Sequence, residues 1–293
     1  MRFLIAALIA MLAWPAAAQM RQINHDGETR RFFVEAPLGS RPAPAVIVLH
    51  GGAGNAHRMR RITNLELAKR GFVEIYPEGI GNRWNDGRVL SDGSQLHDAD
   101  DPGFLRAMID ELAAEGLVDR RRVYFTGASN GGAMTLRMVC QAPDLVAGAV
   151  VVIMNQPVGL DCPKGAPVPM IFIQGTADPL VPFDGGPVTV GRRNRGRVLS
   201  AAETLAQYAL RNRCGAWEEI AITDHDPGDS TTVRHRVWRG CQAPLSQYII
   251  DGGGHTWAGN RSRFLVEKLL GRTSRDISAT FEIETFFGDL AGR

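Results

Sequence analysis

The sequence predicts an α/β fold with one mostly parallel central sheet and helices on both faces. Short runs of β-branched and aromatic residues alternate with helical segments along the whole chain. Several runs, such as residues 45–49 and 169–173, are apolar throughout, which is typical of strands buried on both faces. Residues 123–140 pass from a strand through a glycine-rich turn directly into a helix. No linker or repeat divides the chain, so residues 19–293 are expected to form one domain.

The first half of the chain shows strand, turn and helix signals in alternation. Strands are expected at residues 31–36, 45–49 and 72–76, and a proline-marked turn at 37–44. A helix is expected at 64–69, because Gly71 is placed to end it, and residues 77–96 are expected to form a long loop. Asp101 as cap and Pro102 in the first turn predict a helix that runs to about Glu115.

The second half continues the alternation. Further strands are expected at residues 123–126, 145–153, 169–175, 217–223, 233–239 and 247–250. Further helices are expected at residues 133–140, 200–212 and 279–287.

Residues 1–18 have the pattern of a signal peptide. Arg2 supplies a positive start, residues 3–12 form an apolar run too short to cross a bilayer, and residues 16–18 are three alanines suited to cleavage. We therefore expect a secreted or periplasmic protein that has no contact with the membrane after cleavage. An uncleaved membrane anchor is the alternative, and Pro15 beside the alanines argues against it.

The overall charge gives no sign of a nucleic-acid partner, because the formal net charge is only +2. The main basic cluster is the set Arg192, Arg193, Arg195 and Arg197, and the glycines and asparagine among them favour a solvated loop. Export would allow the four cysteines to form disulfides. Of the three possible pairings we expect Cys140 with Cys162 and Cys214 with Cys241, because these close the shortest loops without crossing.

Ser129 is the candidate nucleophile. It stands at the centre of Gly-Ala-Ser-Asn-Gly, residues 127–131, between a strand and a helix. This is the G-x-S-x-G pattern of the nucleophile elbow, a strained strand-to-helix turn that exposes the serine hydroxyl at the sheet edge. The positive end of the following helix favours the negative charge that develops when the alkoxide attacks a carbonyl.

Asp178 and His255 are the candidate partners of Ser129. A serine hydroxyl needs a base within hydrogen-bond reach and a carboxylate that orients this base, and α/β-hydrolases place them in the chain order Ser, Asp, His. Asp178 directly follows the buried strand at residues 169–175. Of the seven histidines, His255 follows a strand through the glycine run 252–254. The alternatives are that Asp178 is only a turn or cap residue and that His255 is a histidine of a surface loop.

A second glycine-rich turn is the candidate oxyanion hole. Residues 50–53, His-Gly-Gly-Ala, close the strand at 45–49, where esterases of this fold present an N–H group to the oxyanion. We expect the N–H groups of Gly52 and Asn130 to act together, with Ala53 in reserve. His50 is expected to hold the loop by a hydrogen bond and to take no part in proton transfer.

Four blocks of the sequence resemble the secreted polyhydroxybutyrate depolymerase and feruloyl esterase family. They are residues 49–52, residues 127–132, residues 175–178 with 181–183, and the Gly-Gly-Gly-His-Thr-Trp block at 252–257. The resemblance covers nearly all of the mature chain and implies an α/β-hydrolase fold. It also implies that Ser129 is the nucleophile, that His255 is base and acid, and that Asp178 orients His255. The four cysteines resemble positions of this family too.

The predicted activity is hydrolysis of carboxylic esters through an acyl-enzyme, without a cofactor. Feruloyl or acetyl esters of polysaccharides and short hydroxyalkanoate oligomers are the expected substrates. Trp84 and Trp257 are candidate walls of the acyl pocket, although a buried core position is an alternative for Trp84. The acidic run with His97 at residues 97–101 suits helix capping better than a metal site. A peptidase of the same fold and an inactive binding protein are the alternative functions.

Overall fold

The computed structural model describes residues 18–39, 41–90, 93, 97–163, 165–261 and 264–292. Apart from Ala18, the expected signal peptide lies outside these residues. Among the described residues, no helix combines the length and the apolar composition that crossing a bilayer requires.

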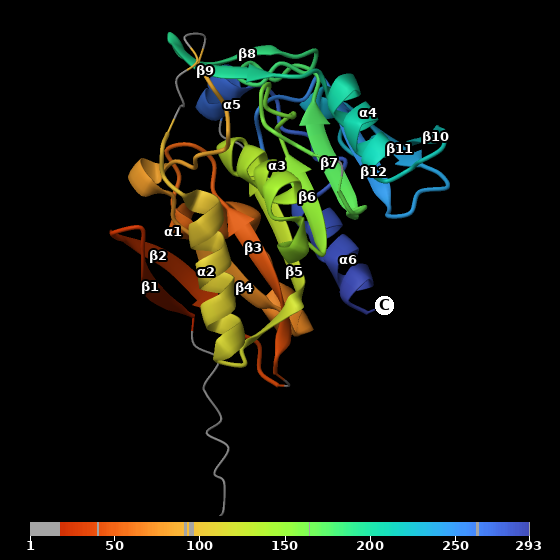
Figure 1. The fold of residues 1–293 in the computed structure, drawn as a ribbon. Coiled ribbons are helices and arrows are strands. Elements are labelled where there is room, and N and C mark those ends of the chain that lie inside the picture. The colour runs from red at the N-terminus through yellow and green to blue at the C-terminus, as the bar shows by residue number, and fades with distance from the viewer. Residues whose placement is uncertain are drawn as a thin grey trace, which may run out of the picture.

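A ten-stranded sheet forms the centre of the molecule (Figure 1). Its strands are β1 (Gln19–His25), β2 (Glu28–Glu35), β3 (Ala43–Leu49), β4 (Val73–Pro77), β5 (Val118–Ala128), β6 (Gly148–Val152), β7 (Met170–Gly175), β10 (Trp217–Ala221), β11 (Thr232–Trp238) and β12 (Leu245–Asp251). They lie in the order β1-β2-β4-β3-β5-β6-β7-β12-β11-β10. Neighbours from β4 to β12 are parallel, and the pairs outside this range are antiparallel. The predicted mostly parallel sheet is confirmed.

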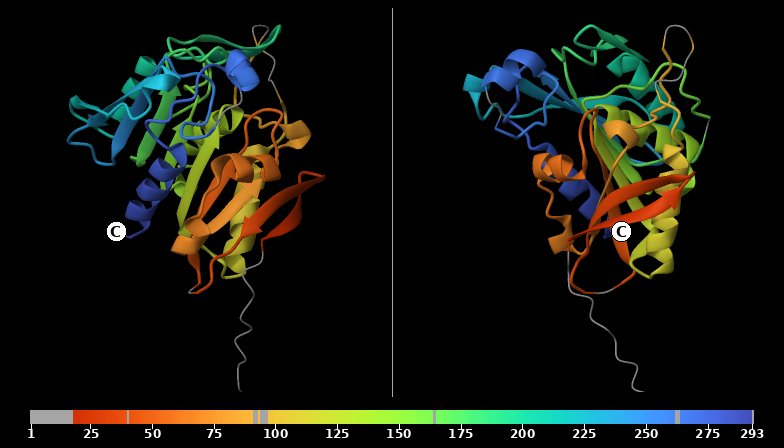
Figure 2. Two further views of the ribbon diagram at one scale, coloured as in Figure 1. Left: turned by 180° about the vertical axis from the view of Figure 1, so that it is seen from behind. Right: turned by 90° about the vertical axis from the view of Figure 1, so that its left-hand side faces the viewer.

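Helices cover both faces of the sheet, as Figure 2 shows from two further sides. The α-helices are α1 (Ala56–Thr63), α2 (Asp101–Ala114), α3 (Asn130–Gln141), α4 (Ala201–Arg211), α5 (Phe264–Leu270) and α6 (Ala279–Ala291). Short 3₁₀ turns are η1 (Leu67–Arg70), η2 (Ile80–Asn82), η3 (Pro143–Leu145) and η4 (Pro227–Asp229). Buried side chains of α2, α3 and α4 share one core, and those of α1 and α6 share the other.

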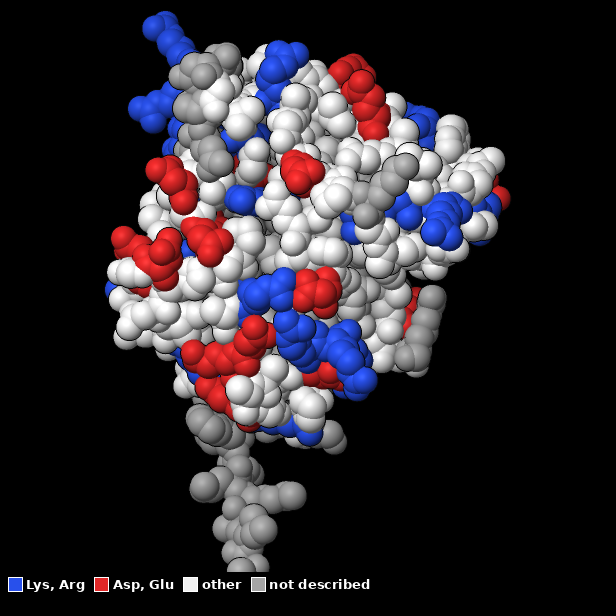
Figure 3. Space-filling model, in the orientation of Figure 1, with Lys and Arg blue, Asp and Glu red and all other residues white. Residues whose placement is uncertain are grey.

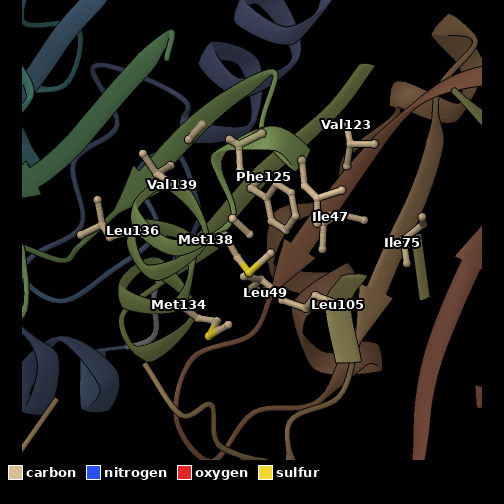
Figure 4. Close-up of a cluster of buried hydrophobic side chains, with 14 of the residues drawn as sticks. Ile47, Leu49, Ile75, Leu105, Val123, Phe125, Met134, Leu136, Met138 and Val139 are labelled. Carbon is tan, nitrogen blue, oxygen red and sulfur yellow. The ribbon is translucent and has the colours of Figure 1, made fainter. Parts of the chain in front are cut away.

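The central strands supply both cores because side chains of a strand alternate between the two faces. In β3, Ile47 and Leu49 belong to the core under α2 and α3, whereas Val46 and Val48 belong to the core under α1 and α6. Figure 4 shows the first of these cores, with Ile47 and Leu49 beside side chains of α3. The continuous apolar run at residues 45–49 is thereby explained.

The parallel strands point to one edge of the sheet, the upper edge in Figure 1. The hairpin of β8 (Gly186–Val190) and β9 (Arg193–Val198) and the helix α5 lie over this edge in Figures 1 and 2. Neither the hairpin nor α5 was expected from the sequence. The four arginines expected in a loop lie in this hairpin, three of them in β9, so the loop prediction is wrong. Arg192, Arg193 and Arg197 are exposed, as expected, and Arg195 is half-buried.

One predicted helix and one predicted helix cap differ from the structure. The prediction of a helix at residues 64–69 is wrong, because α1 lies before this range and ends at Thr63, where Asn64 adopts a left-handed conformation with φ 44°. Residues 67–70 form only a 3₁₀ turn, and Gly71 ends it as predicted. Asp100 caps α2 by accepting a hydrogen bond from the Gly103 N–H, so the cap lies one residue earlier than expected.

Both predicted disulfides are present, Cys140–Cys162 and Cys214–Cys241, and no cysteine is free. Acidic and basic side chains mix over the face that Figure 3 shows. This mixture agrees with the small net charge of +2.

Candidate active site

Ser129 forms the corner between β5 and α3. Its backbone has φ 56° and ψ −120°, a conformation that costs energy for any residue other than glycine. Gly127 and Gly131 are required because other backbone atoms lie too close to leave room for a side chain. A Cβ atom added at Gly127 would lie 2.4 Å from the carbonyl oxygen of Gly131, and one added at Gly131 would lie 2.1 Å from the carbonyl oxygen of Leu49. The G-x-S-x-G pattern therefore forms the strained turn that the sequence predicts.

Asp178 and His255 are in direct contact. Nδ1 of His255 lies 2.7 Å from Oδ2 of Asp178, and the two side chains are only 8% and 3% exposed. The second oxygen of Asp178 accepts hydrogen bonds from the N–H groups of Leu180, at 2.8 Å, and Val181, at 2.9 Å. The carboxylate is thus fixed by its own loop and can hold the imidazole in one orientation.

The three candidate residues follow strands of the same parallel set. Ser129 follows β5, Asp178 follows β7 and His255 follows β12, so all three lie at the edge of the sheet where these strands end. Ser129 is partly exposed. Among the described residues, neither the hydroxyl of Ser129 nor Nε2 of His255 makes a hydrogen bond. Nε2 of His255 is not among the side-chain atoms that are fully buried without a hydrogen-bond partner. The catalytic roles of these residues stay predictions.

The predicted oxyanion residues lie beside the nucleophile. A Cβ atom added at Gly51 would be 3.6 Å from Cβ of Ser129, and one added at Gly52 would be 3.9 Å from Cβ of Asn130. Within the described part of the chain, the backbone N–H groups of Gly52 and Asn130 have no hydrogen-bond acceptor. The N–H of Ala53 donates to the carbonyl of Asn82 at 2.9 Å, which removes Ala53 as the reserve donor.

His50 holds the glycine turn, as the sequence analysis expects. Its Nδ1 lies 2.8 Å from the carbonyl oxygen of Gly51, and its Nε2 accepts the N–H of Gly79 at 3.0 Å. This pattern requires a neutral imidazole with the proton on Nδ1. Burial lowers the pKa of His50, which favours that neutral form.

The side chain of Asn130 makes contacts that were not expected from the sequence. Its Oδ1 accepts the N–H of Trp84 at 2.8 Å, and its Nδ2 donates to the carbonyl of Trp84 at 3.0 Å and to Oδ2 of Asp86 at 2.6 Å. Asp86 is in turn paired with Arg88 at 2.6 Å, and both are almost completely buried. The sequence gives no signal for these contacts, because two charged residues in a loop are ordinarily exposed and only the fold shows that Asp86 and Arg88 are buried as a pair.

The prediction that Trp84 walls the substrate pocket is wrong. Its side chain has no exposed surface, and its indole N–H donates to the carbonyl of His50 at 2.9 Å. The ring therefore belongs to the core under α2 and α3. Trp257 is 5% exposed and donates its indole N–H to Thr280 at 3.1 Å, so its contact with a substrate stays a prediction.

A small cavity lies beside Asp178, at the ends of β6 and β7. Apolar and amide side chains line it together with Asp178, namely Ile153, Met154, Asn155, Gln174, Val181 and Phe183, with the backbone of Gly175. Ile153 has φ 49°, which is a strained conformation for a β-branched residue. Strain thus occurs at the ends of both β5 and β6, which is typical of functional sites.

The acidic run at residues 97–101 has structural partners. Nε2 of His97 lies 3.0 Å from the carbonyl oxygen of Ile80. Asp100 caps α2, and Asp101 forms a buried pair with Arg30 at 2.5 Å. Among the described residues, no three His, Cys, Asp or Glu side chains are grouped as metal ligands.

Comparison with known sequences identifies relatives over most of the chain and a family match over residues 60–155. The chain is 33% identical over 286 residues to the protein named "Putative esterase NocK" of Nocardia uniformis subsp. tsuyamanensis, and the match covers 90% of this chain and 80% of that protein. Feruloyl esterase B of Piromyces equi is 26% identical over 239 residues, which are 77% of this chain and 42% of that protein. The prolyl oligopeptidase family matches residues 60–155, which include Ser129 but not Asp178 or His255.

Comparison with solved structures agrees with the fold. An acetyl xylan esterase from Aspergillus awamori superposes with a TM-score of 0.56 at 17% sequence identity, over 81% of this chain and 94% of that chain. At this identity the similarity shows the fold alone. Together with the extent of the match to NocK, the sheet order and the elbow at Ser129 show that the chain belongs to the α/β-hydrolase esterase family that includes NocK.

Proposed function

We propose that the protein is a secreted serine esterase that forms an acyl-enzyme. The contact between His255 and Asp178, at the sheet edge that also carries the Ser129 elbow, supports this proposal most directly. The names of NocK and feruloyl esterase B support an ester as the substrate. The two disulfides agree with export to an oxidising compartment.

In the proposed reaction, Ser129 Oγ attacks the ester carbonyl while Nε2 of His255 takes its proton. The Nδ1 proton of the imidazole stays on the hydrogen bond to Asp178, which stabilises the imidazolium. The N–H groups of Gly52 and Asn130 hold the oxyanion. The imidazolium then gives its proton to the leaving alcohol. Water attacks the acyl-enzyme in the second step, with His255 again as base, and releases the acid.

The proposed substrates are esters of soluble or oligomeric compounds. They are feruloyl or acetyl esters of polysaccharides and short hydroxyalkanoate oligomers. A panel of methyl ferulate, acetylated xylan, p-nitrophenyl acetate and 3-hydroxybutyrate oligomers distinguishes among these classes.

The decisive experiment compares the wild type with Ser129→Ala. We expect the variant to fold, to lose several orders of magnitude in kcat on p-nitrophenyl acetate, and to lose labelling by a fluorophosphonate. Activity of Ser129→Ala near the wild-type level would refute the proposal. Absence of wild-type activity and labelling would favour an inactive binding protein.

A peptidase is the second candidate, because the prolyl oligopeptidase family matches residues 60–155. The same triad can attack an amide. Comparison of kcat/KM for p-nitrophenyl esters and peptide p-nitroanilides separates the two activities. Preference for the anilides would replace the esterase proposal.

A further inference from the structure

The segment Gly79–Arg88 lies against the turn that carries the first proposed oxyanion donor, Gly52. The carbonyl of Asn82 accepts the N–H of Ala53, the residue after Gly52. At the start of the segment, the N–H of Gly79 donates to Nε2 of His50, at 3.0 Å. The first oxyanion turn is therefore held to this segment on both sides of Gly52.

The same segment holds the second proposed donor through Trp84. The backbone N–H of Trp84 donates to the side-chain oxygen of Asn130, and the side-chain NH₂ of Asn130 donates to the backbone carbonyl of Trp84. Its indole N–H binds the carbonyl of His50 in the first turn. Trp84 thus contacts both turns at once, with no exposed surface of its own.

Buried charge fixes the orientation of the Asn130 amide. Its second N–H donates to Oδ2 of Asp86 at 2.6 Å, and Asp86 also accepts from Arg88. Since a buried carboxylate is stable only with good partners, this contact resists rotation of the amide. Every donor and acceptor of the Asn130 side chain has a partner.

We propose that the segment Gly79–Arg88 is a clamp that sets the separation between the N–H groups of Gly52 and Asn130. Trp84 is its positioning residue, and the side chain of Asn130 is the point at which it holds the second donor. The inference rests on the proposed function. Oxyanion donors act only when both reach one oxygen at about 2.7–3.1 Å. A misplacement of about 1 Å costs on the order of 100-fold in rate.

Asn130→Ala tests the clamp, because it removes the side-chain amide and keeps the backbone N–H. We expect kcat on p-nitrophenyl acetate to fall by roughly 10-fold to 100-fold, with KM within about threefold of the wild type. Binding of a trifluoromethyl ketone, whose adduct with Ser129 places an anionic oxygen in the hole, should weaken in parallel. Rates are normalised to the number of sites that a fluorophosphonate titrates.

Asn212→Ala is the matched control. Asn212 is buried like Asn130, and its amide binds the N–H and carbonyl of Val168 and the carbonyl of Ala243. These contacts lie near the amino end of β7, at the opposite edge from the site. The control should lower the unfolding temperature and keep kcat per titrated site.

Trp84→Phe is the second test, because it keeps most of the ring and removes the hydrogen bond to His50. We expect kcat to fall about threefold to tenfold, the effect of one lost hydrogen bond, and ketone binding to weaken by a similar factor. The clamp is overturned if Asn130→Ala and Trp84→Phe change only the unfolding temperature, as the control does. If Ser129→Ala stays active, the proposed function fails instead.

Discussion

The hydrogen bond between His255 and Asp178 determines which imidazole nitrogen is free. With Nδ1 as donor to Asp178, Nε2 is left unprotonated, as the proposed transfer of a proton from Ser129 requires. The carboxylate cannot turn away, because its other oxygen binds two N–H groups of its own loop, those of Leu180 and Val181. One side chain therefore controls the protonation of its partner.

Asp178→Asn should reverse this arrangement. The amide oxygen would keep the two backbone N–H groups, so the amide NH₂ would face Nδ1 of His255. The imidazole would then carry its proton on Nε2 and could not accept one from Ser129. We expect kcat to fall by about 10³-fold to 10⁴-fold with the fold retained. Steady-state assay and circular dichroism check this, and a loss below tenfold would contradict it.

His50 predicts a pH dependence of stability. Burial lowers the pKa of His50 in the folded protein, so the unfolded chain takes up the proton first as the pH falls. Stability from neutral His50 is complete above the ordinary histidine pKa of about 6.5 and decreases as the pH falls below it. Protonation also removes the acceptor for the N–H of Gly79.

The measurement is the unfolding temperature between about pH 8 and pH 5, across the ordinary histidine pKa. The wild type should lose more stability over this range than His50→Gln does. His57→Gln, at an exposed position, is the control and should follow the wild type. Equal slopes for the wild type and His50→Gln would contradict the prediction.

At the scale of elements, the junction of β3, β5 and α3 leaves no room for a side chain. Gly131→Ala would place a Cβ atom 2.1 Å from the carbonyl oxygen of Leu49, so the helix must move away from the strand. We expect a loss of at least about 2 kcal/mol in the free energy of unfolding, by analogy with overpacked cores, and loss of activity. Urea denaturation measures the first effect.

Gly288→Ala in α6 is the contrasting substitution. No atom lies within 4 Å of the position of its added Cβ. Because alanine costs less backbone entropy in a helix, this variant should gain about 0.5–1 kcal/mol. If both glycine variants lost stability equally, the close approach at Gly131 would not be the cause.

The elements around the proposed catalytic residues could be predicted because the local sequence signals agree with the packing of the whole sheet there. The apolar run at residues 45–49 and the glycines around Ser129 each permit few alternatives. The end of α1 at Thr63 was missed because it depends on the left-handed conformation of Asn64, which most residues other than glycine adopt less readily. The β8–β9 hairpin carries exposed arginines, so its sequence resembles that of a loop.

The position of Trp84 shows where local sequence gives no answer. A tryptophan beside glycines and polar residues suits a pocket wall or a core position equally well. Its partners, Asn130 and His50, are 46 and 34 residues away in the chain. Contacts over such separations depend on the folded sheet, and no pattern within the loop indicates them.

At the scale of the whole molecule, the two disulfides should raise the free energy of unfolding. Their sequence separations of 22 and 27 residues are similar, so each should contribute about 3 kcal/mol by the chain-entropy relation. Cys140→Ser/Cys162→Ser and Cys214→Ser/Cys241→Ser are the two variants to compare by urea denaturation. Each should be less stable by that amount. A loss below about 1 kcal/mol in both would show that the folded protein does not depend on them.

The order of the chain divides the proposed chemistry into two parts. The groups that would hold the oxyanion, with the nucleophile and Trp84, all come before residue 131, and the pair that would carry the proton comes after residue 177. The hairpin and α5, which lie over the site, belong to the later part as well. An exchange of the later part between relatives would therefore change the hairpin and α5 over the site, while the proposed oxyanion donors and their supporting contacts stayed the same. In laboratory evolution of new ester preferences, the turn after β6 is therefore a suitable point at which to join the earlier part of one relative to the later part of another.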